Sequence, residues 1–240
     1  MRSNSHAFMK FDLDPVIEEM RDMVSRWASE KLAPRAAEID EKNLFPRDLW
    51  PELGELGLLG ITVEEEYGGS ALGYLAHVVA MEEIIRASAS VGLSYGAHSN
   101  LCVNQLHRWG SDEQRQRFLP KLVTGEHLGA LAMSEPGAGS DTSAIAMKAE
   151  AIDGGYRLNG SKTFISNGPI ADAVIVYAVT NPDKNVLGRT SCFLVPGDAK
   201  GFDRGSPMEK MGLRTSPMAQ VYLERCRVPD AAVLGGVGSG

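Results

Sequence analysis

The sequence predicts an α+β protein, with an all-α N-terminal domain followed by a β-barrel-like middle domain. Apolar residues recur at the helical period as far as about residue 123. Beyond residue 125, short apolar and β-branched runs bounded by Gly, Asn, Asp and Pro replace that period. The 240 residues are enough for one large domain or two of ordinary size. We therefore expect domains over 1–125 and 126–235, followed by a glycine-rich end at 236–240.

Composition indicates a globular protein and excludes several partner classes. Hydrophobic residues make up 43% and charged residues 23% of the chain, and the formal charge is −7 without any Lys/Arg cluster. We therefore expect no nucleic-acid partner. No apolar run is long enough to cross a membrane, and residues 1–11 lack the apolar core of a signal peptide. The protein is expected in the cytoplasm or in an organelle matrix.

Cysteine and histidine spacing gives no sign of a metal site. Cys102, Cys192 and Cys226 lie too far apart for a CxxC pair or a disulfide framework, which favours a reducing compartment. His98 and His107 are nine residues apart, which does not place two ligands on one helical face. We predict no metal.

Helix signals fill the first half of the chain. Asp14-Pro15 provides an N-cap followed by proline at the first helical position, and Pro34 should end or bend the helix that begins there. Residues 61–69, with three consecutive glutamates, are expected to form a solvated loop. Further helices are predicted from Phe45-Pro46, over 72–89, over 90–108, and from a capping box at Ser111 to Val123.

The helix predicted over 90–108 contains Gly92 and Gly96. Each glycine costs about 1 kcal/mol relative to alanine in a helix, so both need a packing or ligand reason. Leu93, Ala97 and Leu101 follow at intervals of four and form one face. This face either packs against neighbouring helices or lines a ligand pocket.

The second half of the chain predicts a barrel or sandwich of short strands. Asp153-Gly-Gly155 and Asn159-Gly160 have the composition of hairpin turns. Strands are expected at 128–133, 144–151, 156–159, 162–166, 173–178, 191–195 and 220–223.

A glycine-broken loop after the first of these strands carries the strongest functional signal. In Ser134-Glu-Pro-Gly-Ala-Gly-Ser140, glycines at 137 and 139 allow a ligand to approach the backbone, and the hydroxyls and amides supply donors. The loop is either an ordinary turn or a cradle for a phosphate-bearing cofactor. It is not a G-x-G-x-x-G motif.

Two motifs in register decide between these readings. Met-Ser-Glu-Pro-Gly-Ala-Gly-Ser-Asp at 133–141 and Leu-Asn-Gly-Ser-Lys-Thr-Phe-Ile-Ser-Asn-Gly at 158–168 resemble the paired flavin-contacting signatures of the acyl-CoA dehydrogenase family. Residues 92–102 and Tyr177 most resemble members that act on isovaleryl-CoA. The resemblance implies FAD as cofactor and flavin-dependent α,β-dehydrogenation of a short branched-chain acyl-CoA in leucine catabolism. It also implies a homotetramer and an electron-transfer flavoprotein as electron acceptor.

The resemblance also implies roles for individual residues. The implied cofactor-binding residues are Leu131, Met133, Ser134, Gly139, Ser140, Phe164, Ile165 and Ser166, and the implied substrate-binding residues are Leu93, Ala97, Ser140, Gly188 and Arg189. Phe164 stands where the family often has Trp, and Ser134 and Ser166 stand where it often has Thr. Each serine keeps a hydroxyl, and Phe164 keeps a flat apolar wall without the indole N–H.

No catalytic residue is predicted within the chain. The family reaction requires a carboxylate base on the substrate face opposite the flavin, and no carboxylate of this sequence matches that position. In the family, the base lies in a helical domain after the part that this chain resembles, and that domain also completes the FAD site across subunits. We therefore expect the 240 residues to be inactive alone. The alternatives are a non-catalytic FAD or acyl-CoA binding module and a flavin monooxygenase on the same scaffold.

Overall fold

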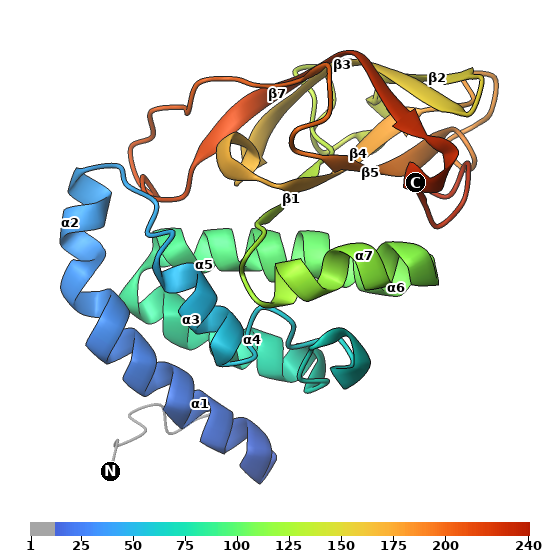
Figure 1. Ribbon diagram of the computed structural model, residues 1–240. Helices are drawn as coiled ribbons and strands as arrows, with labels where there is room; N and C mark the ends of the chain where they lie inside the picture. The colour runs from blue at the N-terminus through green and yellow to red at the C-terminus, as the bar shows by residue number, and fades with distance from the viewer. Residues whose placement is uncertain (1–12) are drawn as a thin grey trace.

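The structure, a computed structural model, describes residues 13–240 and confirms a helical region followed by a β-sheet region (Figure 1). The sheet lies across one side of the helices, next to α6 (Asn104–Trp109) and α7 (Asp112–Val123). The start of the chain, where the sequence predicts no signal-peptide core, lies outside the described residues.

The first helical run passes through Pro34 without ending there. Helix α1 (Pro15–Trp27) begins as predicted, because the Asp14 carboxylate accepts a hydrogen bond from the Val16 N–H at 2.9 Å. A π-helical segment (Ala28–Leu32) and a 3-10 turn (Ala33–Arg35) then lead into α2 (Ala36–Glu41). These irregular turns accommodate a proline that has no N–H to donate.

The remaining helices are close to the predicted positions. They are α3 (Leu49–Glu55), α4 (Gly73–Ala87), α5 (Ala89–Gly96), α6 and α7. Helix α3 starts later than its predicted start at Phe45-Pro46, after a turn, and the loop at 61–69 contains only a short 3-10 turn (Glu65–Tyr67). The capping box of α7 is confirmed by reciprocal hydrogen bonds between Ser111 and Gln114. Among residues 13–240, no helix has the length and apolar character needed to span a bilayer.

The two glycines of α5 have a packing reason. A Cβ at Gly92 would lie 2.3 Å from Cγ1 of Ile85, and a Cβ at Gly96 would lie 3.0 Å from Cε of Met81. Both neighbours belong to α4, so the glycines allow α4 and α5 to approach closely. After α5, the same run continues through a π-helical segment, Ala97–Val103, into α6.

The β region is one mixed, eight-stranded sheet. Its strands are β1 (Gly129–Ala132), β2 (Lys148–Ile152), β3 (Gly155–Ser166), β4 (Ala173–Val179), β5 (Thr190–Pro196), β6 (Phe202–Arg204), β7 (Met218–Pro229) and β8 (Val233–Leu234). The order is β6-β7-β3-β2-β4-β5-β8, and β1 pairs in parallel with β4. The barrel-like expectation needs correction, since the sheet is open between β6 and β8. With three and two residues, these end strands are too short to close it.

One predicted hairpin forms and the other does not. Asp153 and Gly154 connect β2 to β3, whose ends pair at Ile152 and Gly155. Asn159-Gly160 instead lies inside the long strand β3, so the second hairpin prediction was wrong. Its turn propensity is overridden because β3 pairs with β7 along its length, and the Asn159 carboxamide oxygen accepts a hydrogen bond from the Arg225 N–H at 2.8 Å.

A shared apolar cluster joins the helices to the sheet. It includes Cys102 and Leu122 from the helical region and Ile175 and Leu194 from the strands.

His98 also connects the two regions. It accepts a hydrogen bond from the Gly129 N–H at 2.9 Å through Nδ1, and its Nε2 lies 3.0 Å from the Leu122 carbonyl oxygen. Burial lowers the pKa of His98 to about 4, so the ring is neutral near pH 7 and can accept through Nδ1. The start of β1 is thereby fixed over the π-helical segment.

Candidate functional site

The two sequence motifs lie side by side in the structure. The first continues from the end of β1, and the second forms the last part of β3. The Thr163 N–H donates a hydrogen bond of 2.9 Å to the Ser134 carbonyl oxygen and so joins the motifs directly. Segments about 30 residues apart in sequence therefore form one surface.

A small pocket of about 160 Å³ opens where these segments meet the π-helical part of the α5–α6 run. Its lining residues are Ala97, Leu101, Leu131, Met133, Ser134, Phe164, Ile165 and Ser166. Six of the eight predicted cofactor residues are among them, and Ala97 is a predicted substrate residue. Most of the lining side chains are apolar, and the two serines add hydroxyls, so the pocket presents both apolar and polar surface.

Phe164 faces outward because β3 is irregular at this point. Between the pairs Lys162–Val221 and Ile165–Ala219, β3 has two residues where β7 has one, which is a β-bulge. Phe164 adopts the left-handed conformation with φ 58°, and 64% of its surface is exposed. A bulky residue in this conformation costs about 1–3 kcal/mol, which the interactions of the surrounding sheet must offset. The bulge thus presents an aromatic side chain at the mouth of the pocket.

The loop after β1 has room for a ligand against its backbone. A Cβ built on Gly137 or Gly139 would meet no atom within 4 Å, and neither residue has a positive φ. Packing within the described chain therefore gives no reason for glycine at these positions. Gly139 and Ser140 are exposed and lie outside the lining of the pocket. An open, side-chain-free backbone fits a phosphate-bearing group.

A buried ion pair lies directly behind the pocket, and the sequence interpretation missed it. The Lys162 ammonium has 0% exposure and donates to Oε1 of Glu135 at 2.8 Å and to the Met133 carbonyl oxygen at 2.9 Å. Burial lowers the pKa of Lys162, and the Glu135 carboxylate opposes that shift. The available signal was a lysine inside the strand predicted at 162–166, close to the apolar residues Phe164 and Ile165.

Glu135 is held in its charged form by three donors. Burial acts to raise the pKa of Glu135, but hydrogen bonds from Lys162 and from the N–H groups of Ala146 and Met147 hold it below its usual range. A carboxylate with these partners is a poor proton acceptor. No carboxylate lines the pocket within the described part of the chain. The pocket as described therefore contains no general base.

The predicted substrate residues are only partly brought together. Arg189 donates to the carbonyl oxygens of Ser143 and Ile145 at 3.0 and 2.7 Å, so its guanidinium braces the loop after the first motif. Arg189 lines a second small pocket, of about 150 Å³, and Met133 lines both this pocket and the one between the two motifs. Gly188, beside it, has φ 88°. Leu93 is half-buried and lines neither pocket, although it shares a helical run with Ala97.

Tyr177 lines the second pocket, and Cys192 is its cross-strand partner between β4 and β5. Burial raises the pKa of Tyr177, and burial raises the pKa of the Cys192 thiol to about 11. Both groups are therefore protonated near pH 7, and neither provides a nucleophile.

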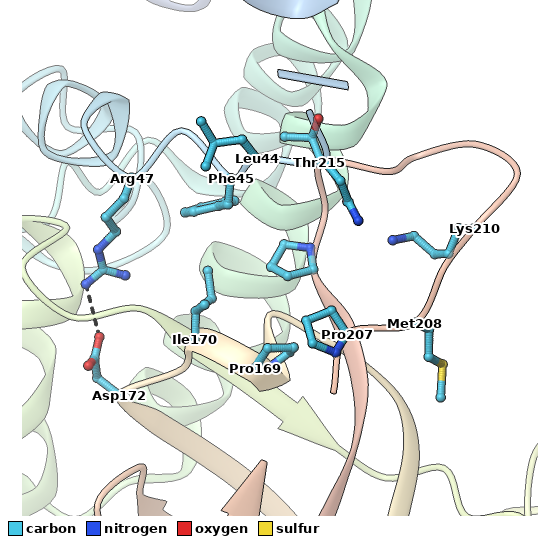
Figure 2. A pocket seen from close by; sticks show the side chains of 12 residues that line it. Leu44, Phe45, Arg47, Pro169, Ile170, Asp172, Pro207, Met208, Lys210 and Thr215 are labelled. Atoms are coloured by element: carbon cyan, nitrogen blue, oxygen red, sulfur yellow. Dashed lines mark hydrogen bonds and ion pairs between the residues drawn. The ribbon is translucent and has the colours of Figure 1, made fainter. Parts of the chain in front are cut away.

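A larger pocket, of about 570 Å³, lies elsewhere (Figure 2). Its charged side chains already have partners within the chain. Its lining comes from residues 43–47, 169–172 and 207–217. Arg47 pairs with Asp172 at 3.1 Å, and the Lys210 ammonium donates to the Ser216 carbonyl oxygen at 2.7 Å. No predicted site residue lines this pocket. Within residues 13–240, no group of three or more His, Cys, Asp or Glu side chains is arranged to hold a metal ion.

Comparisons with known proteins identify both regions of the chain. Residues 15–126 match the model of the acyl-CoA dehydrogenase N-terminal domain, and residues 130–226 match that of the middle domain. Isovaleryl-CoA dehydrogenase, mitochondrial, from Solanum tuberosum is 50% identical over 229 residues, which cover 95% of this chain and 55% of the relative. The chain thus spans about half the length of this curated relative.

Solved structures match the whole described architecture. A glutaryl-coenzyme A dehydrogenase in complex with glutaryl-CoA superposes with a TM-score of 0.92 at 33% identity, covering 96% of this chain and 59% of that one. PigA with FAD and proline superposes with a TM-score of 0.91 at 33% identity, covering 97% of this chain and 61% of that one.

Proposed function

Because this chain belongs to the acyl-CoA dehydrogenase family, we propose that it supplies the FAD-binding and acyl-CoA-binding part of an oxidoreductase. The reaction would be α,β-dehydrogenation of a short branched-chain acyl-CoA such as isovaleryl-CoA. The two parts of the chain, 1–125 and 126–235, would act as an N-terminal helical domain and a middle β domain.

The pocket between the motifs is the observation that carries this proposal. An isoalloxazine ring has apolar faces and a polar edge, and the pocket combines apolar walls with the hydroxyls of Ser134 and Ser166. The glycine loop beyond Ser134 adds the open backbone that a pyrophosphate needs. The residues present therefore fit FAD.

Each of the eight predicted cofactor residues has a role in this proposal. Leu131 and Met133 would form the apolar wall, and Ser134 and Ser166 would donate to the ring edge. Phe164 and Ile165 would pack against the ring. Gly139 and Ser140 would bind the pyrophosphate, and Ser140 would also approach the acyl-CoA. FAD, when bound, supplies the hydride acceptor of the reaction.

The acyl chain would lie against the helical side of the pocket. Ala97 lines it with a small side chain, which leaves room for a branched acyl group, and Leu93 would act from the preceding turn. Gly188 and Arg189 would approach the CoA nucleotide. The guanidinium of Arg189 already donates to two carbonyl oxygens. We therefore propose that it contributes mainly by holding the loop at 142–145.

The base and the protein partners would come from outside the described pocket. No carboxylate lines the pocket in residues 13–240, so we propose that a carboxylate beyond this sequence removes the α proton. An electron-transfer flavoprotein would accept the electrons, and the complete enzyme would be a homotetramer acting in leucine catabolism. We propose the cytoplasm or an organelle matrix as its location.

A spectral titration tests this proposal. The purified chain is mixed with FAD and separated from free flavin. Its absorption across the visible flavin bands is then recorded before and after isovaleryl-CoA is added. We expect a retained flavin band that changes shape with the thioester but is not bleached, since no base is present. Bleaching would contradict the missing base, and absence of retained flavin would contradict the binding role. A retained band that is indifferent to the thioester would favour a flavin monooxygenase on this scaffold.

A further inference from the structure

Lys162 connects the two motifs more tightly than the backbone alone does. Its ammonium donates to the Met133 carbonyl oxygen at 2.9 Å and to Oε1 of Glu135 at 2.8 Å. The adjacent Thr163 N–H donates to the Ser134 carbonyl oxygen at 2.9 Å. Three consecutive residues of the first motif are thus attached to two consecutive residues of β3.

Glu135 closes the loop that follows. Its Oε2 accepts from the Ala146 N–H at 2.8 Å, and its Oε1 accepts from the Met147 N–H at 3.0 Å. The backbones of Glu135 and Ala138 also exchange two hydrogen bonds, at 2.8 and 3.1 Å. One carboxylate therefore holds both ends of the loop at 136–145, which contains Gly139 and Ser140.

Stability alone does not account for a charged pair at this place. Lys162 is fully buried, and only 8% of the Glu135 side chain is exposed. Desolvation of two charges offsets much of their attraction, and well-packed apolar residues are often as stable as a buried ion pair. A reason for the pair therefore lies in the geometry it imposes. Any backbone arrangement that separated the two buried charges would leave each without its partner, so few alternative arrangements are possible.

We propose that Lys162 and Glu135 are positioning residues that preorganise the loop at 136–145 and the Met133–Ser134 backbone for the flavin. This inference rests on the proposed function for the identity of the ligand. The loop geometry itself can be tested without any ligand. Neither side chain lines the pocket, so both act through the backbone that they hold.

The test compares four proteins by hydrogen–deuterium exchange, thermal melting and FAD binding. They are the unchanged chain, Lys162→Met, the double variant Lys162→Met/Glu135→Gln, and the control Arg157→Met. Arg157 also lies on β3 and pairs with Glu150 at 2.8 Å, but both side chains are substantially exposed. Exchange is followed in peptides that contain the Ala146, Met147 and Thr163 amides, without flavin.

We expect Lys162→Met to lower the melting temperature, because it leaves a buried carboxylate unpaired. The double variant removes both charges and should recover most of that loss. Its loop amides should nevertheless exchange about tenfold faster or more than those of the unchanged chain, and its FAD affinity should fall about tenfold or more. The flavin that it does bind should show a less structured visible band. Arg157→Met should match the unchanged chain in all three measurements.

Recovery of stability together with slow loop exchange in the double variant would overturn the inference, because the pair would then have only a structural role. Equal loosening by Arg157→Met would also overturn it. If the unchanged chain retained no FAD while the loop exchange differed as expected, the proposed function would fail and the loop geometry would stand.

Discussion

Strand β3 has two halves that are built differently. From Gly155 to Leu158 it pairs without interruption with both β2 and β7, and its charged residue, Arg157, faces solvent. From Lys162 to Ser166 it pairs with β7 across a bulge, buries its charged residue and exposes an aromatic one. The first half has the features of an ordinary strand in a sheet: uninterrupted pairing on both sides and a solvent-exposed charge. The second half departs from that pattern wherever a pocket, a loop or a neighbouring motif requires it.

The largest difference between the halves should appear when their lysine and arginine are removed. We expect Lys162→Met to destabilise the fold by about 3–5 kcal/mol, because the Glu135 charge is left buried without an opposite charge beside it. Arg157→Met should change stability by less than about 1 kcal/mol, since its pair is largely exposed. Urea unfolding at pH 7 measures both. Equal losses would show that burial does not distinguish the two pairs.

Two glycines next to these halves should differ next. Gly160 has φ 147°, and a Cβ there would lie 3.0 Å from Cβ of Met147. We expect Gly160→Ala to cost about 2–3 kcal/mol from backbone strain and crowding. Gly154, in the hairpin before the regular half, has φ 72° with open space around it, so Gly154→Ala should cost only about 1 kcal/mol. Thermal melts of the two variants give the comparison, and a larger loss at Gly154 would reverse it.

Acid should affect the irregular half through Glu135. The pKa of Glu135 is lowered in the folded protein from an ordinary value of 4.5, so its contribution to stability is fully present above that value. It is lost as the pH falls through the folded pKa, because protonation removes the charge that Lys162 faces. The stability difference between the unchanged chain and Glu135→Gln should therefore shrink below pH 4.5. A difference that stayed constant between about pH 6 and pH 3 would contradict this coupling.

The smallest effect should be a gain in stability. Phe164 is in the left-handed conformation and is mostly exposed, so Phe164→Gly relieves strain while losing little burial. We expect stability to rise by up to about 1 kcal/mol, with weaker FAD binding because the aromatic wall is lost. Calorimetry and a flavin titration on one preparation would measure both. A variant that bound FAD as well as the unchanged chain would remove Phe164 from the proposed site.

The sequence predicted the parts of the fold that local chemistry decides. The Asp14 cap, the Ser111 capping box and the Asp153-Gly154 hairpin depend on neighbouring residues only, and the structure contains all three. Asn159-Gly160 has equally good turn residues but is held in a strand by β7, a partner more than 60 residues away. The open sheet likewise depends on how short β6 and β8 are, which no local signal gives.

The candidate site shows the same division. The two motifs were visible in the sequence, and the structure brings five of their predicted residues into one pocket, together with Leu131 of β1. The pairing of Lys162 with Glu135 was not foreseen, because lysine and glutamate are usually exposed and only the tertiary fold buries both. Leu93, Ala97 and Leu101 were expected to share one face, but only Ala97 and Leu101 line the pocket. Both belong to the π-helical segment that begins at Ala97, whose turns differ from those of the α-helix that contains Leu93.

The most direct test of the account is a hydrogen–deuterium exchange footprint of FAD on the purified chain. The proposed site predicts slower exchange in peptides covering 131–141 and 163–166 when FAD is added, with no change in 148–158, the regular part of the sheet beside it. Protection confined to 43–47 and 207–217, the lining of the larger pocket, or no protection at all, would contradict the proposal that these two motifs form the flavin site.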